Sequence, residues 1–178
     1  MKAAVAFMLF AVSAFAFAQD QSSIQSAQAA CGPSPAKFDV SETKPETKKV
    51  LPDSDPARAL VYVIEEQKFK AVRDVTARFA VDGQWVGANR GNSYFFFFAD
   101  PSEHHLCVDW ISDHVRNGRL VSLNHFTARA GETYYFRIRT SGSPNVVDGA
   151  TLDLDAINSD EGKLLVASSA LAKSHPKK

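Results

Sequence analysis

The stretch SYFFFFADPSEHHLCVDW contains the residues of this sequence best suited to chemistry, because two adjacent histidines precede a cysteine. Imidazole and thiolate groups are preferred zinc ligands, so His104, His105 and Cys107 suggest a metal site. Neighbouring residues of a strand point to opposite faces, which leaves only His105 and Cys107 on one face. Zinc would need further ligands, such as Cys31 or Asp109. No H-E-x-x-H or paired C-x-x-C motif is present, so we favour structural histidines and predict neither a metal nor another cofactor.

The two cysteines, Cys31 and Cys107, are predicted to form a disulfide. An even cysteine count in an exported chain favours pairing, and export is argued below. Closing so long a loop would stabilise the fold by roughly 4 kcal/mol. The alternatives are buried free thiols, or a nucleophilic Cys107 with His105 or His125 as its base. A strand interior is a poor setting for a reactive thiolate, so we favour the disulfide.

Asp109, Asp113 and His114 form a polar cluster in DWISDHVRNG. Two carboxylates can perform acid–base chemistry or bind calcium. The calcium-loop pattern is absent, as are the G-x-S-x-G elbow, the phosphate loop and the dinucleotide fingerprint. We therefore interpret the cluster as a solvated hairpin connection and predict no catalytic residues.

Five consecutive aromatic residues, Tyr94–Phe98, must face both sides of any strand that contains them. Burial on both sides is the favoured interpretation, because large aromatic side chains usually lie in the core. If one side were uncovered, it would bind a partner or a sugar ring. The candidate binding face comprises Trp85, Tyr94 and Trp110.

The N-terminus has the features of a signal peptide. Lys2 provides a positive charge, an apolar stretch follows, and Ala16-Phe17-Ala18 has the small-x-small form of a cleavage site. Residues 1–18 are therefore predicted to be removed after Ala18. Cys31 is not a predicted lipidation site, because polar Gln28 occupies the position where a lipobox has an aliphatic residue.

The charge balance limits the partners of the chain. The 178 residues include 20 basic and 20 acidic side chains. Without a basic excess, nucleic acid is a poor partner. No later stretch is long and apolar enough to span a bilayer. We therefore expect an exported protein of the periplasm or extracellular space, with an unidentified protein or glycan as its partner.

The pattern along the chain predicts one mostly β domain. Residues 19–56 are polar and predicted to be a flexible leader, tethered by Cys31. Short alternating segments separated by turn residues, such as Asp82-Gly83, fill residues 57–172. Asn158 and Glu161 have capping-box spacing, which predicts a short helix whose apolar face would contain Leu164, Leu165, Ser168 and Leu171. Residues 173–178 are predicted to fray. The predicted fold is an antiparallel immunoglobulin-like or transthyretin-like β-sandwich with a short C-terminal helix.

Five motifs, in their order along the chain, form the basis of a family resemblance: ALVYVI, VDGQWVGANRGNSYF, DPSEHHLCVDW, FTARAGETYYFRIR and DEGKLLVASS. Over Ala57–Ser169 the chain resembles the bacterial envelope family designated domain of unknown function 2846. Members usually have Pro-Gly-x-His where this chain has Pro101-Ser102-Glu103-His104, and many are lipoproteins. The family has no established activity, so the resemblance implies fold and location but no catalytic residues. It also implies that His104 begins the strand after a tight turn and hydrogen-bonds nearby backbone.

Three functions are compatible with these observations. The favoured hypothesis is an exported, non-enzymatic β-sandwich that binds or scaffolds in the cell envelope. The first alternative is a metal-dependent or hydrolytic enzyme that uses His104, His105, Asp109 and Asp113. The second is an envelope subunit that assembles with copies of itself through edge strands.

Overall fold

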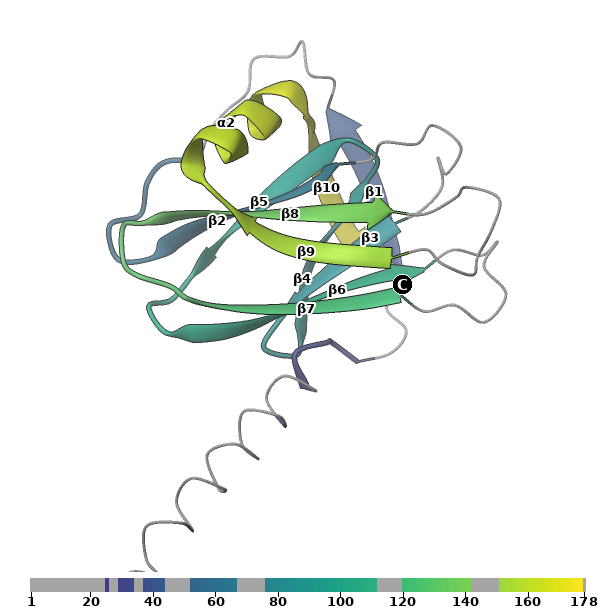
Figure 1. Cartoon of the computed structure of the whole chain (residues 1–178), viewed down its shortest axis with the longest axis horizontal. Helices are drawn as coiled ribbons and strands as arrows, with labels where there is room; N and C mark the ends of the chain where they lie inside the picture. The colour runs from purple at the N-terminus through teal and green to yellow at the C-terminus, as the bar shows by residue number, and fades with distance from the viewer. Residues whose placement is uncertain are drawn as a thin grey trace, which may run out of the picture.

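The computed structural model describes residues 25, 29–33, 37–43, 52–66, 76–111, 120–141 and 151–177. Within these ranges the chain forms two β-sheets and one short helix that lies across the larger sheet (Figure 1). The predicted signal peptide with its cleavage site after Ala18, and the residues Asp113 and His114, lie outside the described residues.

Strands from distant parts of the sequence make up the larger sheet. In spatial order they are β1 (Phe38–Thr43), β10 (Ala170–Pro176), β5 (Ser93–Ala99), β2 (Ala59–Glu66), β8 (Thr133–Ser141) and β9 (Thr151–Ile157). The smaller sheet contains β4 (Gln84–Arg90), β3 (Thr76–Val81), β6 (Glu103–Ile111) and β7 (Leu120–Thr127), in that order. The prediction of a mostly β chain with two sheets is confirmed.

The sequence analysis predicted antiparallel sheets, but the larger sheet also contains parallel pairs. The β2–β8 and β10–β5 pairs are parallel, and all other pairs are antiparallel. After β5 the chain enters the smaller sheet as β6 and β7, then re-enters the larger sheet as β8 in the direction of β2. The sheet is therefore mixed, as is common in sheets of this size.

Alternation along β2 and β5 builds the core on both faces of the larger sheet. Phe95 on β5 lies between the two sheets with Val63 of β2, whereas Tyr94 packs on the opposite face. There it meets Tyr62 and Tyr135, whose rings stack 5.2 Å apart. The aromatic run therefore faces both sides of its strand, as predicted.

The predicted hairpin is present between β3 and β4. Asp82 and Gly83 both have positive φ, of 48° and 79°, as a tight two-residue turn requires. The neighbouring turn before β5 also has a positive-φ glycine, Gly91. Both turns are thus recognisable from residues that tolerate positive φ in the local sequence.

Helix α2 (Ser159–Ser168) begins where the capping residues predicted. The Asn158 side-chain oxygen accepts hydrogen bonds from the backbone N–H groups of Asp160 and Glu161. The predicted apolar face is confirmed at Leu165, which packs against the aromatic cluster of the sheet, but not at Leu164, which is 68% exposed. The buried helical residues are Gly162 and Val166.

Gly162 allows the helix backbone to approach the larger sheet closely. A Cβ atom at this position would come within 2.2 Å of the Tyr135 ring. The absence of a side chain therefore lets the helix backbone rest on the aromatic ring, an approach that an apolar-periodicity pattern does not reveal. Leu171, expected on the helix, lies instead in β10.

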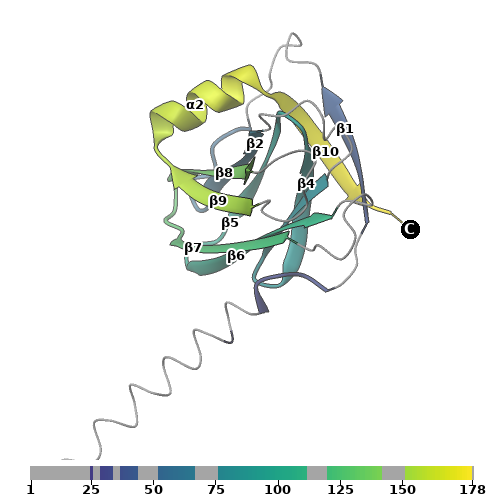
Figure 2. The same ribbon diagram turned by 45° about the vertical axis from the view of Figure 1, so that its right-hand side comes forward.

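Both predicted ends of the domain require correction. Strand β1 lies inside the predicted leader 19–56, and β10 extends into the predicted frayed tail 173–178. The two strands pair over six residues, from Phe38 opposite Pro176 to Thr43 opposite Leu171, and run side by side in Figure 2. Phe38 is only 8% exposed, so the pairing buries an apolar anchor that neither short segment could bury alone.

Side chains connect the two sheets at their edges. The Asn124 amide on β7 donates to the Leu154 carbonyl of β9 at 2.8 Å. At the opposite edge, the Ala88 N–H of β4 donates to the Ser174 hydroxyl of β10 at 2.9 Å. The sandwich is therefore partly closed along both edges. Among the residues described, no helix has the length and apolarity needed to cross a membrane.

Candidate functional site

The predicted Cys31–Cys107 disulfide is present. The two sulfur atoms are 2.00 Å apart and the Cα atoms 5.0 Å apart. Cys107 is fully buried in β6, whereas Cys31 lies in the N-terminal segment and is partly exposed. The bond therefore fastens that segment to the outer face of the smaller sheet.

Close contacts hold the N-terminal segment 29–33 along this face. The Ala30 carbonyl accepts from the Gly83 N–H at 3.0 Å, and the Pro33 carbonyl accepts from the Trp85 indole N–H at 2.9 Å. Gly32 lies against the indole, where a Cβ would be 2.4 Å from Nε1. The segment thus covers Trp85 and seals the disulfide from one side.

A buried ion pair lies beneath the same indole. Arg78 on β3 donates to Asp109 on β6 at 2.8 Å, and its guanidinium carbon is 4.5 Å from the centre of the Trp85 ring. Asp109 is fully buried, so its predicted place in a solvated connection is wrong. The register of β3 and β6 sets these two residues directly opposite each other, which compensates the buried charge.

His104 connects two turns and binds through both ring nitrogens. Nδ1 is 2.7 Å from the Asp82 carboxylate in the β3–β4 hairpin. Nε2 is 2.8 Å from the Asp100 carbonyl and 3.0 Å from the Ser102 hydroxyl, in the turn before β6. The side chain is 11% exposed. The expected turn–strand role of His104, with a bond to nearby backbone, is confirmed.

Ser102, His104 and Asp82 have the order of a serine–histidine–aspartate triad, but the imidazole has an additional acceptor beside Nε2. A general base needs a free lone pair at Nε2, directed at the serine hydroxyl. Here Nε2 faces the Asp100 carbonyl, which is an acceptor, and Nδ1 faces a carboxylate. Both nitrogens are therefore best satisfied as donors, in the imidazolium form.

The pKa of His104 agrees with this assignment. Burial acts most strongly and lowers it. The hydrogen bonds to Asp100 and Asp82, with the negative charges of these residues, outweigh burial and raise the pKa above its ordinary value. With an acceptor facing each ring nitrogen, the imidazole has no free lone pair for the proton of Ser102, so the arrangement suits a structural clasp between turns.

His105 lies away from His104, as alternation predicted. Its ring is 6.3 Å from that of His125 on β7, and its Nε2 is 3.9 Å from the Glu103 carboxylate. Cys107 on the same face is held in the disulfide. In the part of the chain that the structure describes, no three histidine, cysteine or acidic residues are grouped to hold a metal ion.

The candidate aromatic binding face is not formed. Trp110 is 7% exposed and packs in the core between the sheets, and Tyr94 is 1% exposed beneath the helix. Trp85 belongs to a third cluster, with Ala30 and the disulfide. The prediction is wrong because the three rings lie in different layers: Trp110 between the sheets, Tyr94 under the helix and Trp85 on the outer face of the smaller sheet.

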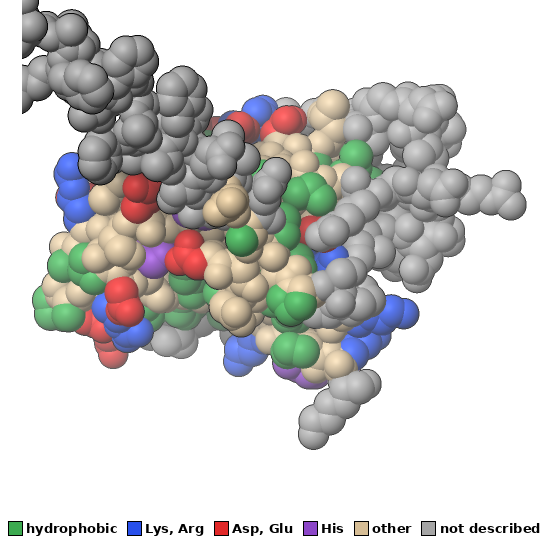
Figure 3. All heavy atoms as spheres, turned by 90° about the horizontal axis from the view of Figure 1, so that it is seen from below, with side chains coloured by type: hydrophobic (Ala, Val, Ile, Leu, Met, Phe, Trp, Pro, Cys, Tyr) green, Lys and Arg blue, Asp and Glu red, His purple; other side chains and the backbone are tan. Residues whose placement is uncertain are grey.

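The outer face of β7 carries exposed apolar side chains. Val121 is 42% exposed and Leu123 45%. Figure 3 views the molecule from below the orientation of Figure 1, where β7 lies, and shows hydrophobic side chains as separate patches among polar ones. Single exposed apolar residues of this kind are common on protein surfaces.

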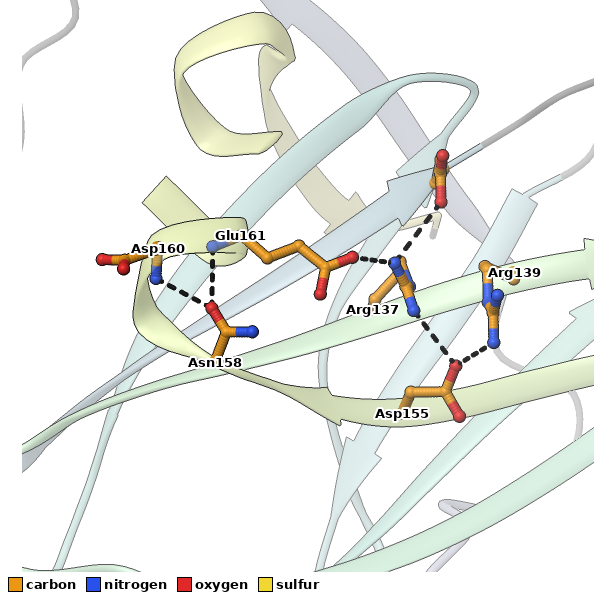
Figure 4. A network of polar contacts seen from close by, with 7 residues as sticks. Arg137, Arg139, Asp155, Asn158, Asp160 and Glu161 are labelled. Atoms are coloured by element: carbon orange, nitrogen blue, oxygen red, sulfur yellow. Dashed lines mark hydrogen bonds and ion pairs between the residues drawn. The ribbon is translucent and has the colours of Figure 1, made fainter. Parts of the chain in front are cut away.

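An ion-pair network that the sequence analysis missed joins the helix to the larger sheet (Figure 4). Arg137 on β8 contacts Glu161 of the helix and lies 3.7 Å from Asp155 on β9 and 3.8 Å from Glu66 on β2. Asp155 also accepts from Arg139 at 2.6 Å. The alternating sequence TYYFRIR places both arginines on this face, but their partners come from three other elements. Because three carboxylates surround two guanidinium groups, the network positions the helix and leaves no excess positive charge for an anion.

Comparisons with protein-family models, with curated proteins and with solved structures found no match to this chain. The resemblance to the domain of unknown function 2846 family therefore stays a prediction.

Proposed function

We propose that the chain is an exported, non-enzymatic β-sandwich that binds or scaffolds a protein or glycan partner in the bacterial cell envelope. The observation that carries the proposal is the disulfide between Cys31 and Cys107. Disulfides persist in oxidising compartments and are rare in the cytosol, where thiols are kept reduced. The predicted signal peptide is consistent with the same location.

The geometry around His104 supports a role without catalysis. The histidine is held between two acceptors, and Asp109 is committed to Arg78. His104 and Asp109, two residues of the enzyme hypothesis, are thus engaged in fastening turns and strands. His105 faces the opposite side of β6 from His104, beside His125 of β7.

Cell fractionation with thiol alkylation tests the proposal. The full chain is expressed in a bacterium, intact cells are treated with a maleimide, and the protein is recovered from the periplasmic fraction for intact-mass measurement. We expect a monomer that begins at Gln19 and takes up two alkyl groups only after reduction. Retention in the cytosol, or free alkylation of both cysteines, would contradict the proposal. A Cys31→Ser/Cys107→Ser variant controls for non-specific labelling.

The hydrolase alternative is favoured by one observation, the alignment of Ser102, His104 and Asp82 within hydrogen-bond distance. A fluorophosphonate probe, which labels activated serine nucleophiles, tests it directly. We expect no labelling of Ser102. Labelling that disappears in Ser102→Ala would instead establish a nucleophile and overturn the non-enzymatic proposal.

We also propose that the domain belongs among immunoglobulin-like or transthyretin-like sandwiches. Two packed, antiparallel-rich sheets support this grouping, whereas the parallel β2–β8 and β10–β5 pairs depart from it. Strand order in an experimental structure, compared with both fold classes, tests it. A different order of the strands around the core would reject the grouping.

A further inference from the structure

Glu65 is an acidic residue enclosed in the interior near the end of β2. It lies on the same side of the strand as Val63, a residue of the core between the sheets, and is 3% exposed. Its Oε2 atom has no hydrogen-bond partner within the described part of the chain. Asn89 on β4 is also fully buried nearby, where its amide donates to the Val63 carbonyl. An ionised carboxylate at this position would keep a buried oxygen without a hydrogen bond, which is costly in the interior.

The position of Glu65 coincides with a fork in the larger sheet. Ser93 of β5 pairs with Glu65 on one side and with Ala170 of β10 on the other. Strand β10 pairs with β5 through only two residues, and Ser174 farther along β10 bonds to β4. We call the paired strands β1 and β10 the β1–β10 ribbon; it passes from the larger sheet toward β4, as Figure 2 shows.

The two strands of the ribbon share a longer register with each other than with the rest of the domain. Its two strands share a six-residue register, and the Lys177 ammonium lies 2.9 Å from the Asp39 carboxylate at one end. Attachment to the body includes the two residue pairs with β5, the Ala170 N–H bond to the Asn92 carbonyl, the Ser174 bond and buried side chains such as Phe38 and Ala172. The longest backbone ladder of either strand is thus the one that joins it to the other.

Two charged groups act on Glu65 from the elements around it. The pKa of Glu65 is raised to about 8: burial raises it most, the Glu42 carboxylate on β1 also raises it, and Arg90 on β4 lowers it. The residues paired beside Glu65, Ser93 on β5 and Ile138 on β8, are uncharged. The ribbon therefore brings its own negative charge, Glu42, toward the enclosed carboxyl group.

We propose that Glu65 is a proton-dependent latch for the β1–β10 ribbon. With the carboxyl group protonated, the ribbon closes over this end of the interior. Ionisation favours a state in which the ribbon has lifted, because water then reaches the carboxylate and Glu42 moves away from it. This conformational role goes beyond the binding function proposed above and does not depend on it.

Amide hydrogen exchange of the full chain, in the wild type and in Glu65→Gln, tests the latch. The ratio of wild-type to variant exchange at each pH removes the intrinsic pH dependence of exchange. An exposed carboxyl group ionises near pH 4.5, so the opening constant of the ribbon should rise about tenfold per pH unit above that value in the wild type relative to the variant. The rise should level off near the pKa of the closed state, about 8.

The location of the effect distinguishes a latch from general unfolding. We expect the ratio of wild-type to variant exchange to rise with pH at the amides of Val40 and Ala172, which lie in the ribbon. At Val108 in β6 the ratio should stay constant. Glu42→Gln should move the plateau to lower pH, whereas Glu103→Gln, which changes an exposed acid on β6, should behave as wild type. A constant ratio in the ribbon, or the same rise at Val108, would overturn the proposal.

Discussion

Arg78 and Asp109 form an ion pair at 2.8 Å in which both side chains are almost completely removed from solvent. The pair lies directly across the β3–β6 ladder, and the Trp85 ring covers the guanidinium. A buried charge without compensation is far more costly than an exposed one. The register of β3 and β6 thus places the guanidinium under the Trp85 ring, and the N-terminal segment packs on the same ring.

Breaking this pair should destabilise the domain strongly. We expect Asp109→Asn to lower the free energy of unfolding by about 3–5 kcal/mol, because the Arg78 charge would stay buried without its carboxylate. Urea denaturation measures the change. The double variant Arg78→Met/Asp109→Leu should lose less stability than Asp109→Asn. Equal losses would show that packing, rather than charge compensation, governs this position.

Removal of the disulfide should separate the N-terminal segment from the smaller sheet. In Cys31→Ser/Cys107→Ser, we expect a loss of about 4 kcal/mol of stability, since the unfolded chain regains the freedom of a long loop. Guanidinium denaturation of wild type and variant gives the value, and the indole fluorescence of Trp85 should report greater solvent contact. Unchanged stability would mean that Ala30, Gly32 and Pro33 hold the segment without the bond.

Local patterns predicted the features that depend on neighbours in sequence. The Asp82-Gly83 hairpin, the Asn158 cap and the two-sided aromatic run were all recognisable, because turn geometry, capping and strand alternation are local. The disulfide was predictable from a count of two cysteines in a chain expected to be exported.

Features that depend on register between distant segments could not be predicted in this way. The β1–β10 pairing joins Phe38 to Pro176 across nearly the whole domain, and neither polar segment has a strong strand signal. The Arg78–Asp109 pair likewise exists only when β3 and β6 align in one register. A sequence pattern gives the face on which each residue lies, but not the residue that it meets.

The clasp made by His104 predicts a pH dependence of stability with a definite sign. Burial lowers the pKa of His104 in the folded protein, but Asp100 and Asp82 raise it above the ordinary value. The native state therefore stabilises the protonated imidazole. Its stabilisation is fully present below about pH 6.5, the unfolded value, and is lost as pH rises through the folded pKa. We expect the stability difference between wild type and His104→Gln to be largest in acid and to shrink toward alkaline pH.

Urea denaturation across this pH range measures that difference, and NMR titration of the imidazole gives the pKa directly. His125→Gln, at an exposed position on β7, serves as the matched control for loss of a histidine. A His104 pKa below the ordinary value would contradict the imidazolium assignment and reopen the base role toward Ser102.

The contact between Gly162 and Tyr135 predicts that a better helix former will weaken the fold. Alanine favours a helix over glycine by about 1 kcal/mol, so helix propensity alone would make Gly162→Ala stabilising. The added Cβ, however, would come within 2.2 Å of the ring on which the helix rests, so the helix must lift or the ring must move. We therefore expect a net loss of about 1–3 kcal/mol. Thermal denaturation measures it, with the exposed helical position Lys163→Ala as the control; a stabilised Gly162→Ala would show that Tyr135 moves aside without cost, and that the helix is not held at its present height by this contact.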